Sequence, residues 1–170
     1  MGAEKITILG IDPGTATTGF GVITSERQQI KLVDYGCVMT KAGVEHAQRL
    51  SQIYTELTAI IKKYQPQAMA VEKLFFYNNA KTALAVGEAR GVILLTAKQN
   101  KLSIYEYTPL QVKQAVSAYG KAEKKQIQSM VKILLNMRDI PKPDDAADAL
   151  AIAITCASSA RATDILALKN

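Results

Sequence analysis

ITILGIDPGTATTGFGVITS, residues 6–25, is the stretch that decides the fold. An apolar run ends at Asp12, a Pro-Gly turn follows, and a second run rich in β-branched residues begins at Gly19, so the stretch reads as two strands joined by a turn. A third apolar run follows a short polar turn, and three successive strands favour an antiparallel meander. The predicted strands cover Lys5–Asp12, Gly19–Ser25 and Gln29–Thr40.

Beyond the meander the sequence alternates between helical and strand patterns. Apolar residues three or four positions apart indicate helices, whereas short continuous apolar runs indicate buried strands. The predicted helices cover Val44–Tyr64, Asn79–Asn100, Pro109 to a stop at Gly120, Ala122–Asn136 and Asp144–Ala160, and the predicted strands cover Ala68–Glu72 and Leu102–Tyr107. Thr108 and Gln111 supply a capping box for the helix that begins at Pro109. The order predicts an α/β fold, a five-stranded mixed sheet with helices on both faces.

The composition indicates one globular domain over residues 1–170 and weakly favours an anionic partner. The 170 residues are 48% apolar and 21% charged, which excludes long disordered or collagen-like segments, and 21 basic residues outweigh 15 acidic ones. Neither a leader pattern nor an apolar run of membrane-spanning length is present, so the chain is expected to be cytoplasmic, without a membrane partner. Cys37 and Cys156 lie far apart in apolar stretches and are predicted to be buried free thiols.

Two carboxylates occupy positions that strands usually avoid. Asp12 ends the apolar run ITILGI and Glu72 ends the run AMAV, so each acid lies at the carboxyl end of a strand predicted to be buried. An isolated charge there is costly, and ligand sites in α/β sheets favour this edge. A helix cap or a surface ion pair would explain either acid alone, but the equivalent placement of both favours a functional site.

A further acidic cluster opens the last predicted helix, in the segment PKPDDAADALAIAIT (141–155). Asp145 and Asp148 are three residues apart and share a helical face, and Asp144 is four residues before Asp148. Asp144 is also the natural N-cap, so spacing alone leaves Asp144 and Asp145 as alternatives. Clustered carboxylates without a matching His or Cys suit Mg²⁺ or Mn²⁺, and two such ions would support phosphodiester hydrolysis.

Several longer motifs run in order along the chain from Ile11 to Ile154. They are IDPGTATTGFGV, VEKLFFYNNA, GEARG, YTPLQVKQAV, GKAEKKQ and DDAADALAIAI. Together they resemble the RuvC-type crossover junction endodeoxyribonucleases. The resemblance implies an RNase H-like fold and an enzyme of DNA recombination and repair that resolves Holliday junctions. It also implies a homodimer that nicks opposed strands symmetrically with Mg²⁺, and the branch-migration proteins RuvA and RuvB as partners.

The catalytic acids of that family map onto four residues of this sequence. Its first-strand Asp falls on Asp12, its Glu after the fourth strand on Glu72, and its DxxD pair on Asp145 and Asp148. Some members carry His at the first position of that pair, where this chain has Asp145. The resemblance therefore selects Asp145 over Asp144, and it assigns all four acids to catalysis and to Mg²⁺ binding.

Candidate DNA-binding residues lie in two segments. Phe75 and Phe76 follow Glu72 in a predicted turn, where aromatic rings either stack on unpaired bases or close the core. In the resembling family a Phe at the position of Phe75 stacks on a base at the opened junction. The second segment, residues 113–132, is rich in lysine and suits phosphate binding, although such a run is also typical of a solvated face. The predicted contacts there are Lys113, Lys121, Lys124 and Lys125, of which Lys113 and Lys124 match the family.

Three other functions compete with a junction nuclease. The turn DPGTATTGFGV also resembles the phosphate loop of sugar kinases, actin and heat-shock ATPases, but those proteins need two such domains to enclose a nucleotide. A nuclease-like protein of the related YqgF type would act on RNA or lack junction activity. A structural junction-binding protein would not need four acids, because carboxylates repel DNA unless a metal neutralises them. Gly87 and Gly91, four residues apart, favour close helix packing, including packing at a dimer interface.

Overall fold

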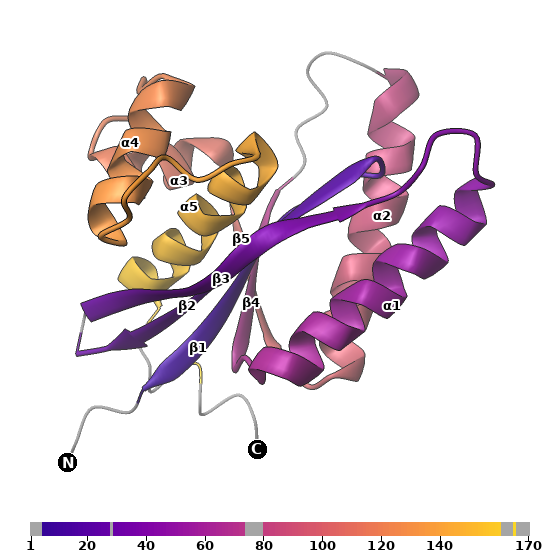
Figure 1. Cartoon of the computed structure of the whole chain (residues 1–170), viewed down its shortest axis with the longest axis horizontal. Helices are drawn as coiled ribbons and strands as arrows, with labels where there is room; N and C mark the ends of the chain where they lie inside the picture. Colours follow the sequence, from indigo (N-terminus) through magenta and orange to yellow (C-terminus); the bar gives the residue numbers. More distant parts are fainter. Residues whose placement is uncertain (1–4, 28, 74–79, 161–164, 166–170) are drawn as a thin grey trace.

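The computed structural model describes residues 5–27, 29–73, 80–160 and 165, and it confirms the predicted order of elements (Figure 1). The strands are β1 (Ile6–Asp12), β2 (Thr17–Glu26), β3 (Gln29–Met39), β4 (Ala68–Glu72) and β5 (Ser103–Tyr107). The helices are α1 (His46–Tyr64), α2 (Ala80–Gln99), α3 (Pro109–Ser117), α4 (Lys124–Leu134) and α5 (Asp144–Ser159). The boundaries lie close to the predicted ones, except at the end of α3.

The strands form one mixed sheet in the order β3-β2-β1-β4-β5. β1, β2 and β3 are the predicted antiparallel meander, in which Asp12 lies opposite Gly19. β4 pairs in parallel with β1, and β5 with β4, because α1 and α2 carry the chain back along the sheet. β1 and β4 are therefore central neighbours whose carboxyl ends meet at one edge, the edge that ligand sites favour.

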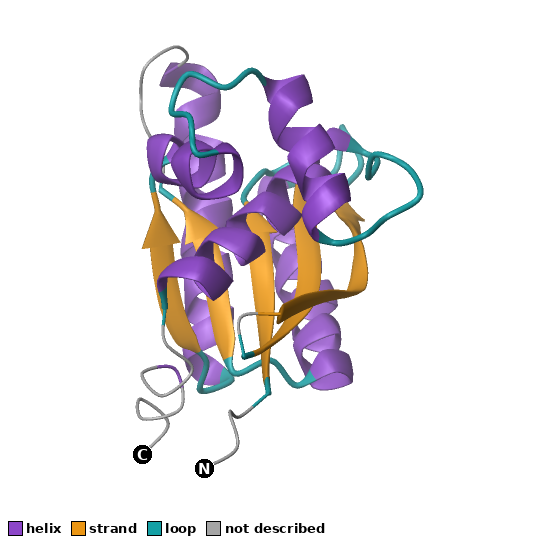
Figure 2. Ribbon diagram, turned by 90° about the vertical axis from the view of Figure 1, so that its left-hand side faces the viewer, coloured by secondary structure: helices purple, strands orange, loops and turns teal. Residues whose placement is uncertain are grey.

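Helices cover both faces of the sheet, as Figure 2 shows. Alternate residues of each strand point to opposite faces. Ile8 and Ala70 lie in the core cluster under α3, α4 and α5, whereas Leu9 and Val71 lie in the cluster under α1 and α2. The run of α5 from Ala149 to Cys156 is buried throughout, because the sheet and two helices enclose it. Within the described residues, no helix is long and apolar enough to cross a membrane.

The end of α3 corrects one prediction. The helix stops at Ser117 with Ala118 in the left-handed conformation (φ 58°), and not at Gly120. The Ser117 hydroxyl oxygen accepts the Tyr119 N–H at 3.2 Å, and this local bond closes the helix early. A side chain that caps its own helix end is sufficient without a glycine.

Two further predictions about single residues are wrong. Asp144 is the first residue of α5 and not its N-cap, which is Pro143, because the Asp144 side chain accepts a hydrogen bond from Gln128 of α4 instead. Cys37 is only partly buried, because it lies on the edge strand β3, whereas Cys156 is fully buried as predicted. Both thiols are free.

Candidate active site

Asp12 and Glu72 end their strands on the same face of the sheet. The residues four positions before them, Ile8 and Ala68, belong to the core under α5, so both acids are also directed toward that helix. The preceding residues of β1 and β4 pair in parallel register. Strand pairing therefore places the two acids side by side at the carboxyl ends of neighbouring strands.

Glycines on β1 and β2 let the first turns of α5 lie directly on the sheet. A Cβ on Gly19 would lie 2.0 Å from the carbonyl oxygen of Asp145, and a Cβ on Gly10 would lie 2.1 Å from that of Ala149. Both distances are far inside van der Waals contact, so no larger residue fits without moving the helix. Because Gly19 is also the strand partner of Asp12, this close approach places Asp145 beside Asp12.

Threonines hold the turn that follows β1. The Thr18 hydroxyl donates to the carbonyl oxygen of Gly14 at 2.6 Å, and the Thr40 hydroxyl donates to that of Thr15 at 2.6 Å. Arg49 Nε donates to Thr40 Oγ1 at 2.7 Å and so links the turn to α1. These bonds fix the path of the chain immediately after the first acid.

The four acids influence one another through their charges. Burial is the largest cause, and the charges of the other three acids the next, of a rise in the pKa of Asp12 to about 8. Burial likewise raises the pKa of Glu72, and the charge of Asp148 adds to it. The pKa of Asp148 is raised in turn, again chiefly by burial. The structure therefore gathers Asp12, Glu72, Asp145 and Asp148 into one acidic cluster, where a cation would relieve the repulsion.

Lys124, the first residue of α4, lies against two acids of α5. Its Nζ is 3.0 Å from Asp148 Oδ2 and 3.3 Å from Asp144 Oδ2. Gln128, one turn further along α4, donates to Asp144 Oδ1 at 3.0 Å. The bonds from Gln128 and Lys124 lower the pKa of Asp144. Asp144 thus joins α4 to α5, while Lys124 reaches the edge of the acidic cluster.

The chemistry of the acidic cluster fits Mg²⁺ or Mn²⁺. Carboxylates are the hard oxygen ligands that these ions prefer, and four of them face one region. Among the described residues, no three acidic, histidine or cysteine side chains lie close enough together to enclose an ion as they stand. A bound ion would therefore draw the carboxylates closer, and Asp148 would exchange its contact with Lys124 for the ion.

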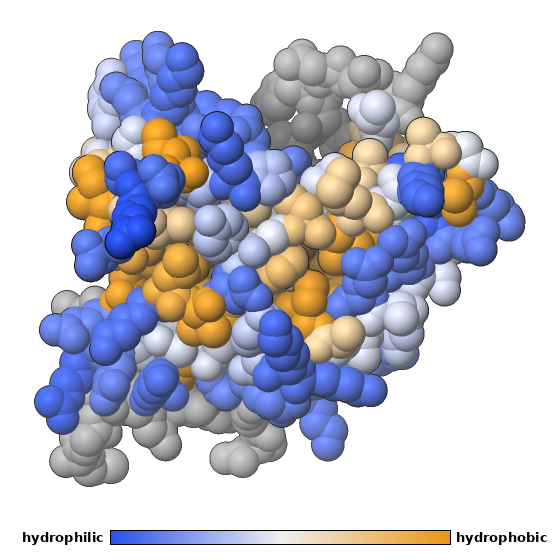
Figure 3. All heavy atoms as spheres, in the orientation of Figure 1, coloured by the Kyte–Doolittle hydropathy of each residue, from blue (hydrophilic) through white to orange (hydrophobic). Residues whose placement is uncertain are grey.

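The predicted DNA-binding lysines lie on α3, on α4 and between them. Three of them are exposed: Lys121, Lys124 and Lys125. Figure 3 shows hydrophilic residues, interrupted by apolar ones, over the region of α4 at its upper left. Lys113 is partly buried, and its charge opposes the rise in the pKa of Glu72, so it acts on the same site. Phe75 and Phe76 lie outside the described residues.

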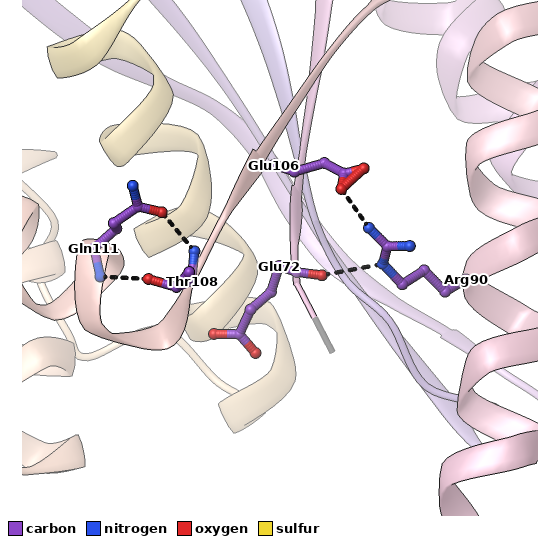
Figure 4. Close-up of polar contacts among 5 residues, drawn as sticks. All are labelled: Glu72, Arg90, Glu106, Thr108 and Gln111. Carbon is purple, nitrogen blue, oxygen red and sulfur yellow. Dashed lines mark hydrogen bonds and ion pairs between the residues drawn. The ribbon is translucent and has the colours of Figure 1, made fainter. Parts of the chain in front are cut away.

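One charged pair at this edge was not predicted from the sequence. Arg90 of α2 lies with its Nη2 2.8 Å from Glu106 Oε2, and its Nε donates to the Glu72 carbonyl oxygen at 3.3 Å (Figure 4). A signal was present in the sequence, because Arg90 and Glu106 interrupt the apolar segments ALAVGEARGVILL and SIYEY. Charged residues in such segments usually have a partner.

Comparisons with known proteins agree on one family. The family model described as crossover junction endodeoxyribonuclease RuvC matches residues 8–156. The crossover junction endodeoxyribonuclease RuvC of Caldicellulosiruptor saccharolyticus is 57% identical over 148 residues, which cover 86% of this chain and 89% of that protein. The protein of the same description from Halothermothrix orenii is 55% identical over 156 residues, which cover 92% of this chain and 94% of that protein.

Solved structures show the same likeness at the level of the fold. Thermus thermophilus RuvC in complex with a Holliday junction substrate superimposes with a TM-score of 0.87 at 34% identity, covering 94% of this chain and 97% of that one. The yeast mitochondrial Holliday junction resolvase matches with a TM-score of 0.65 at 14% identity, covering 95% of this chain and 79% of that one, and shows the fold alone. The sheet and its helices thus have the expected RNase H-like fold.

Proposed function

The chain belongs to the crossover junction endodeoxyribonuclease RuvC family, and from this membership we propose that the acidic cluster is its active site. The protein is a Holliday junction resolvase, an endonuclease of DNA recombination and repair. The family consists of metal-dependent nucleases. The catalytic and metal-binding residues that we propose are Asp12, Glu72, Asp145 and Asp148.

The environment of Asp12 is the observation that supports this assignment. Its carboxyl group is buried at the end of a central strand, among three other acids that help to raise its pKa to about 8. Such an arrangement costs folding free energy, and perturbed acids of this kind are concentrated at functional sites. A cation bound among the four acids would offset the repulsion between their negative charges, which explains why the acids lie together.

The residues of the chain hold and orient what the reaction needs. Asp12 and Glu72 present their carboxylates from two central strands, and Asp145 presents its carboxylate from a helix packed directly on the sheet, so the main chain that carries all three is in place before DNA binds. Bound Mg²⁺, or Mn²⁺ in its place, with two ions per site, would supply water of lowered pKa and neutralise charge at the scissile phosphate. Lys124 lies where it can exchange its Asp148 contact for a DNA phosphate.

The lysine surface and the aromatic segment are proposed to hold the junction. Lysine carries a mobile point charge, which suits contact with backbone phosphates more than readout of base edges. The proposed phosphate contacts are Lys113, Lys121, Lys124 and Lys125. Phe75 and Phe76 follow the strand that carries Glu72, and we propose that one of them stacks on an unpaired base.

The outer side of α2 supports a homodimer. Leu84 is 69% exposed and Leu95 is 55% exposed, and a Cβ on Gly91 would meet no atom within 4 Å. These three positions share one stripe of the helix. The close packing predicted at Gly91 has no partner within the described chain, and a second copy would supply one. Two copies provide the two active sites that paired symmetric nicks require.

Family membership also supports three wider proposals. RuvA and RuvB would be partners, because a resolvase acts on the junctions that branch-migration proteins move. A cytoplasmic location is proposed because a resolvase has to reach the DNA on which it acts. Residues 1–170 would form one nuclease domain, since a single family model matches residues 8–156.

Substitution of each acid tests the active site. Asp12→Asn, Glu72→Gln, Asp145→Asn and Asp148→Asn each remove one charge with little change of volume. We expect each variant to slow the cutting of a synthetic four-way junction in Mg²⁺ by about a hundredfold or more, because a ligand and its fixed charge are lost. Junction binding, measured in chelator by gel shift, should remain.

Asp139→Asn is the matched control, because Asp139 is an exposed acid beyond the end of α4. It should cut as the unmodified chain does. Full turnover by Asp12→Asn or Asp148→Asn would show that the substituted residue is not a catalytic acid.

A further inference from the structure

We propose that Arg90 is a positioning residue that holds the end of β4 so that the Glu72 carboxylate faces α5 and the other acids of the cluster. The inference rests on the proposed function, because it concerns how one of the proposed catalytic acids is held. It adds a residue on α2, on the opposite face of the sheet from α5, to the machinery of the active site.

Arg90 reaches from the middle of α2 to the ends of β4 and β5. Its Nη2 forms an ion pair with Glu106 Oε2 at 2.8 Å, and its Nε donates to the carbonyl oxygen of Glu72 at 3.3 Å. Figure 4 shows the guanidinium on one side of the strand end and the Glu72 carboxylate on the other. Arg90 therefore acts on the main chain of Glu72 and not on its carboxylate.

The peptide group between Glu72 and Lys73 is held from two directions. Its carbonyl oxygen accepts the bond from Arg90, and its N–H donates to the Tyr107 carbonyl oxygen at 2.8 Å. Because a peptide group is planar, fixing both of its polar atoms fixes the plane and, with it, the direction in which the Glu72 side chain leaves the strand. Removing the Arg90 bond would leave this peptide group held from one direction only.

The strand register explains why Glu106 is available to Arg90. Val71 pairs with Glu106, and Glu72 pairs with Tyr107. Val71 lies in the core under α1 and α2, so Glu106 faces those helices, whereas Tyr107 and Glu72 face α5. Glu106 of β5 thus pairs with Arg90 on the face covered by α1 and α2, whereas Glu72 of β4 faces α5 and the proposed active site.

The surroundings of Arg90 restrict the geometry of its side chain. The side chain of Arg90 is 18% exposed and that of Glu106 is 36% exposed. Ala89 and Ile93, the flanking residues of α2, are fully buried. A planar guanidinium has enough N–H donors to bond a carboxylate and a carbonyl together, whereas lysine has a single nitrogen. Arginine therefore reaches the two acceptors with two separate nitrogens, Nε and Nη2.

Arg90→Met and Arg90→Lys test the proposal, with Lys98→Met as the control. Lys98 is exposed near the end of the same helix, so its substitution removes the same charge away from the strand end. We expect Arg90→Met to weaken Mn²⁺ binding, measured by calorimetry without DNA, about tenfold. Single-turnover cutting in Mg²⁺ should slow between about tenfold and a hundredfold, with junction affinity in chelator kept. Arg90→Lys should lie between Arg90→Met and the unmodified chain, and Lys98→Met should match the latter.

The unfolding midpoint of each variant separates positioning from loss of structure. If Arg90→Met does not fold, the Mn²⁺ affinity of Arg90→Lys tests the proposal instead. Weaker Mn²⁺ binding by a folded Arg90→Lys supports the proposal, and unchanged Mn²⁺ binding overturns it. Unchanged cutting and Mn²⁺ binding by a folded Arg90→Met also overturn it.

Glu72→Gln distinguishes this failure from failure of the active-site assignment. If Glu72→Gln loses Mn²⁺ affinity and cutting while the folded Arg90 variants keep both, only the positioning role is wrong. If Glu72→Gln itself binds Mn²⁺ and cuts normally, then Glu72 is not a catalytic acid and the inference about Arg90 falls with it.

Discussion

Asp12 illustrates at the residue scale how a strand end becomes a site. In β1, every residue before Asp12 is buried except Thr7, which is partly exposed. The Asp12 carboxylate therefore lies at the end of a buried strand. The neighbouring acids then make ionisation harder, and the pKa rises to about 8. A single side chain thereby links the folding free energy of the protein to its proposed affinity for metal ions.

Asp12→Asn is expected to stabilise the ion-free protein at alkaline pH. The pKa of Asp12 is about 8 in the folded chain against an ordinary value of 3.8. Between these values the folded state keeps a proton that the unfolded state has lost, so the free energy of unfolding falls as pH rises. Asparagine does not titrate, so the variant lacks this pH-dependent loss of stability. Urea unfolding in chelator should show the variant to be more stable at pH 9 by on the order of a few kcal/mol, with a much smaller difference at pH 5. An equal difference at both pH values would contradict the burial argument.

Lys124→Ala is expected to flatten the salt dependence of junction binding. If Lys124 neutralises one DNA phosphate, its loss should reduce the slope of log affinity against log salt by about 0.9. Binding can be measured in a Glu72→Gln background, which we expect not to cut. Lys98→Ala, on the exposed end of α2, should leave the slope unchanged. A slope unaltered by Lys124→Ala would show that this lysine serves only its contacts with Asp144 and Asp148.

The sequence indicated that the four proposed acids lie near one another, but it did not indicate their contacts with basic residues. Asp12 and Glu72 stand out because each ends an apolar strand, and resemblance to a known family chose Asp145 over Asp144. The bond from Lys124 to Asp148 joins two helices whose docking no local pattern encodes. The bridge made by Arg90 likewise depends on the register of two strands and on the position of α2.

At the scale of elements, the contact between α5 and the sheet sets the geometry of the site. Helix α5 touches β1 and β2 more closely than a side chain would permit, and the first turn of the helix carries Asp145. The secondary structure was predictable because apolar periodicity and turn residues are local. The early end of α3 was not predictable, because the Ser117 bond that closes it competes with the better-known glycine signal at Gly120.

Gly19→Ala should destabilise the protein and misplace the first turn of α5. The new Cβ would lie 2.0 Å from a main-chain oxygen of Asp145, and a main chain cannot rotate away as a side chain can. We expect a loss of about 1–3 kcal/mol in the free energy of unfolding, measured with urea, and slower cutting by the folded protein. Gly36→Ala is the comparison, because the three atoms nearest to its Cβ would all belong to the Phe20 side chain, the closest at 3.0 Å. Equal losses in the two variants would argue against a special role for the α5 contact.

The whole molecule divides its two helical layers between different tasks. The layer of α3, α4 and α5 carries two of the proposed catalytic acids and the lysines, while the layer of α1 and α2 leaves Leu84 and Leu95 exposed. The fold could be predicted because the order of strands and helices limits the possible sheets. From the sequence, an assembly of two chains was indicated mainly by family resemblance, because the spacing of Gly87 and Gly91 suits packing within one chain as well as packing between two.

Leu84→Glu combined with Leu95→Glu should convert the proposed dimer to a monomer. Two buried carboxylates at a symmetric interface would each lack a partner, and such charges disrupt association. Sedimentation velocity should show half the mass of the unmodified protein, and paired nicking should be lost. Val33→Glu, at an exposed apolar position of the edge strand β3, should leave the mass unchanged. A dimer that survives the α2 substitutions would place the interface elsewhere.

The measurement that tests the central claim most directly is a map of cuts on a labelled synthetic four-way junction and on a linear duplex of the same sequence. Each substrate would be incubated with the protein in Mg²⁺ and, separately, in chelator. We expect paired nicks at symmetric positions in opposed strands of the junction, only in Mg²⁺, with the duplex left intact. Cutting that persists in chelator, or equal cutting of junction and duplex, would contradict a metal-dependent junction resolvase.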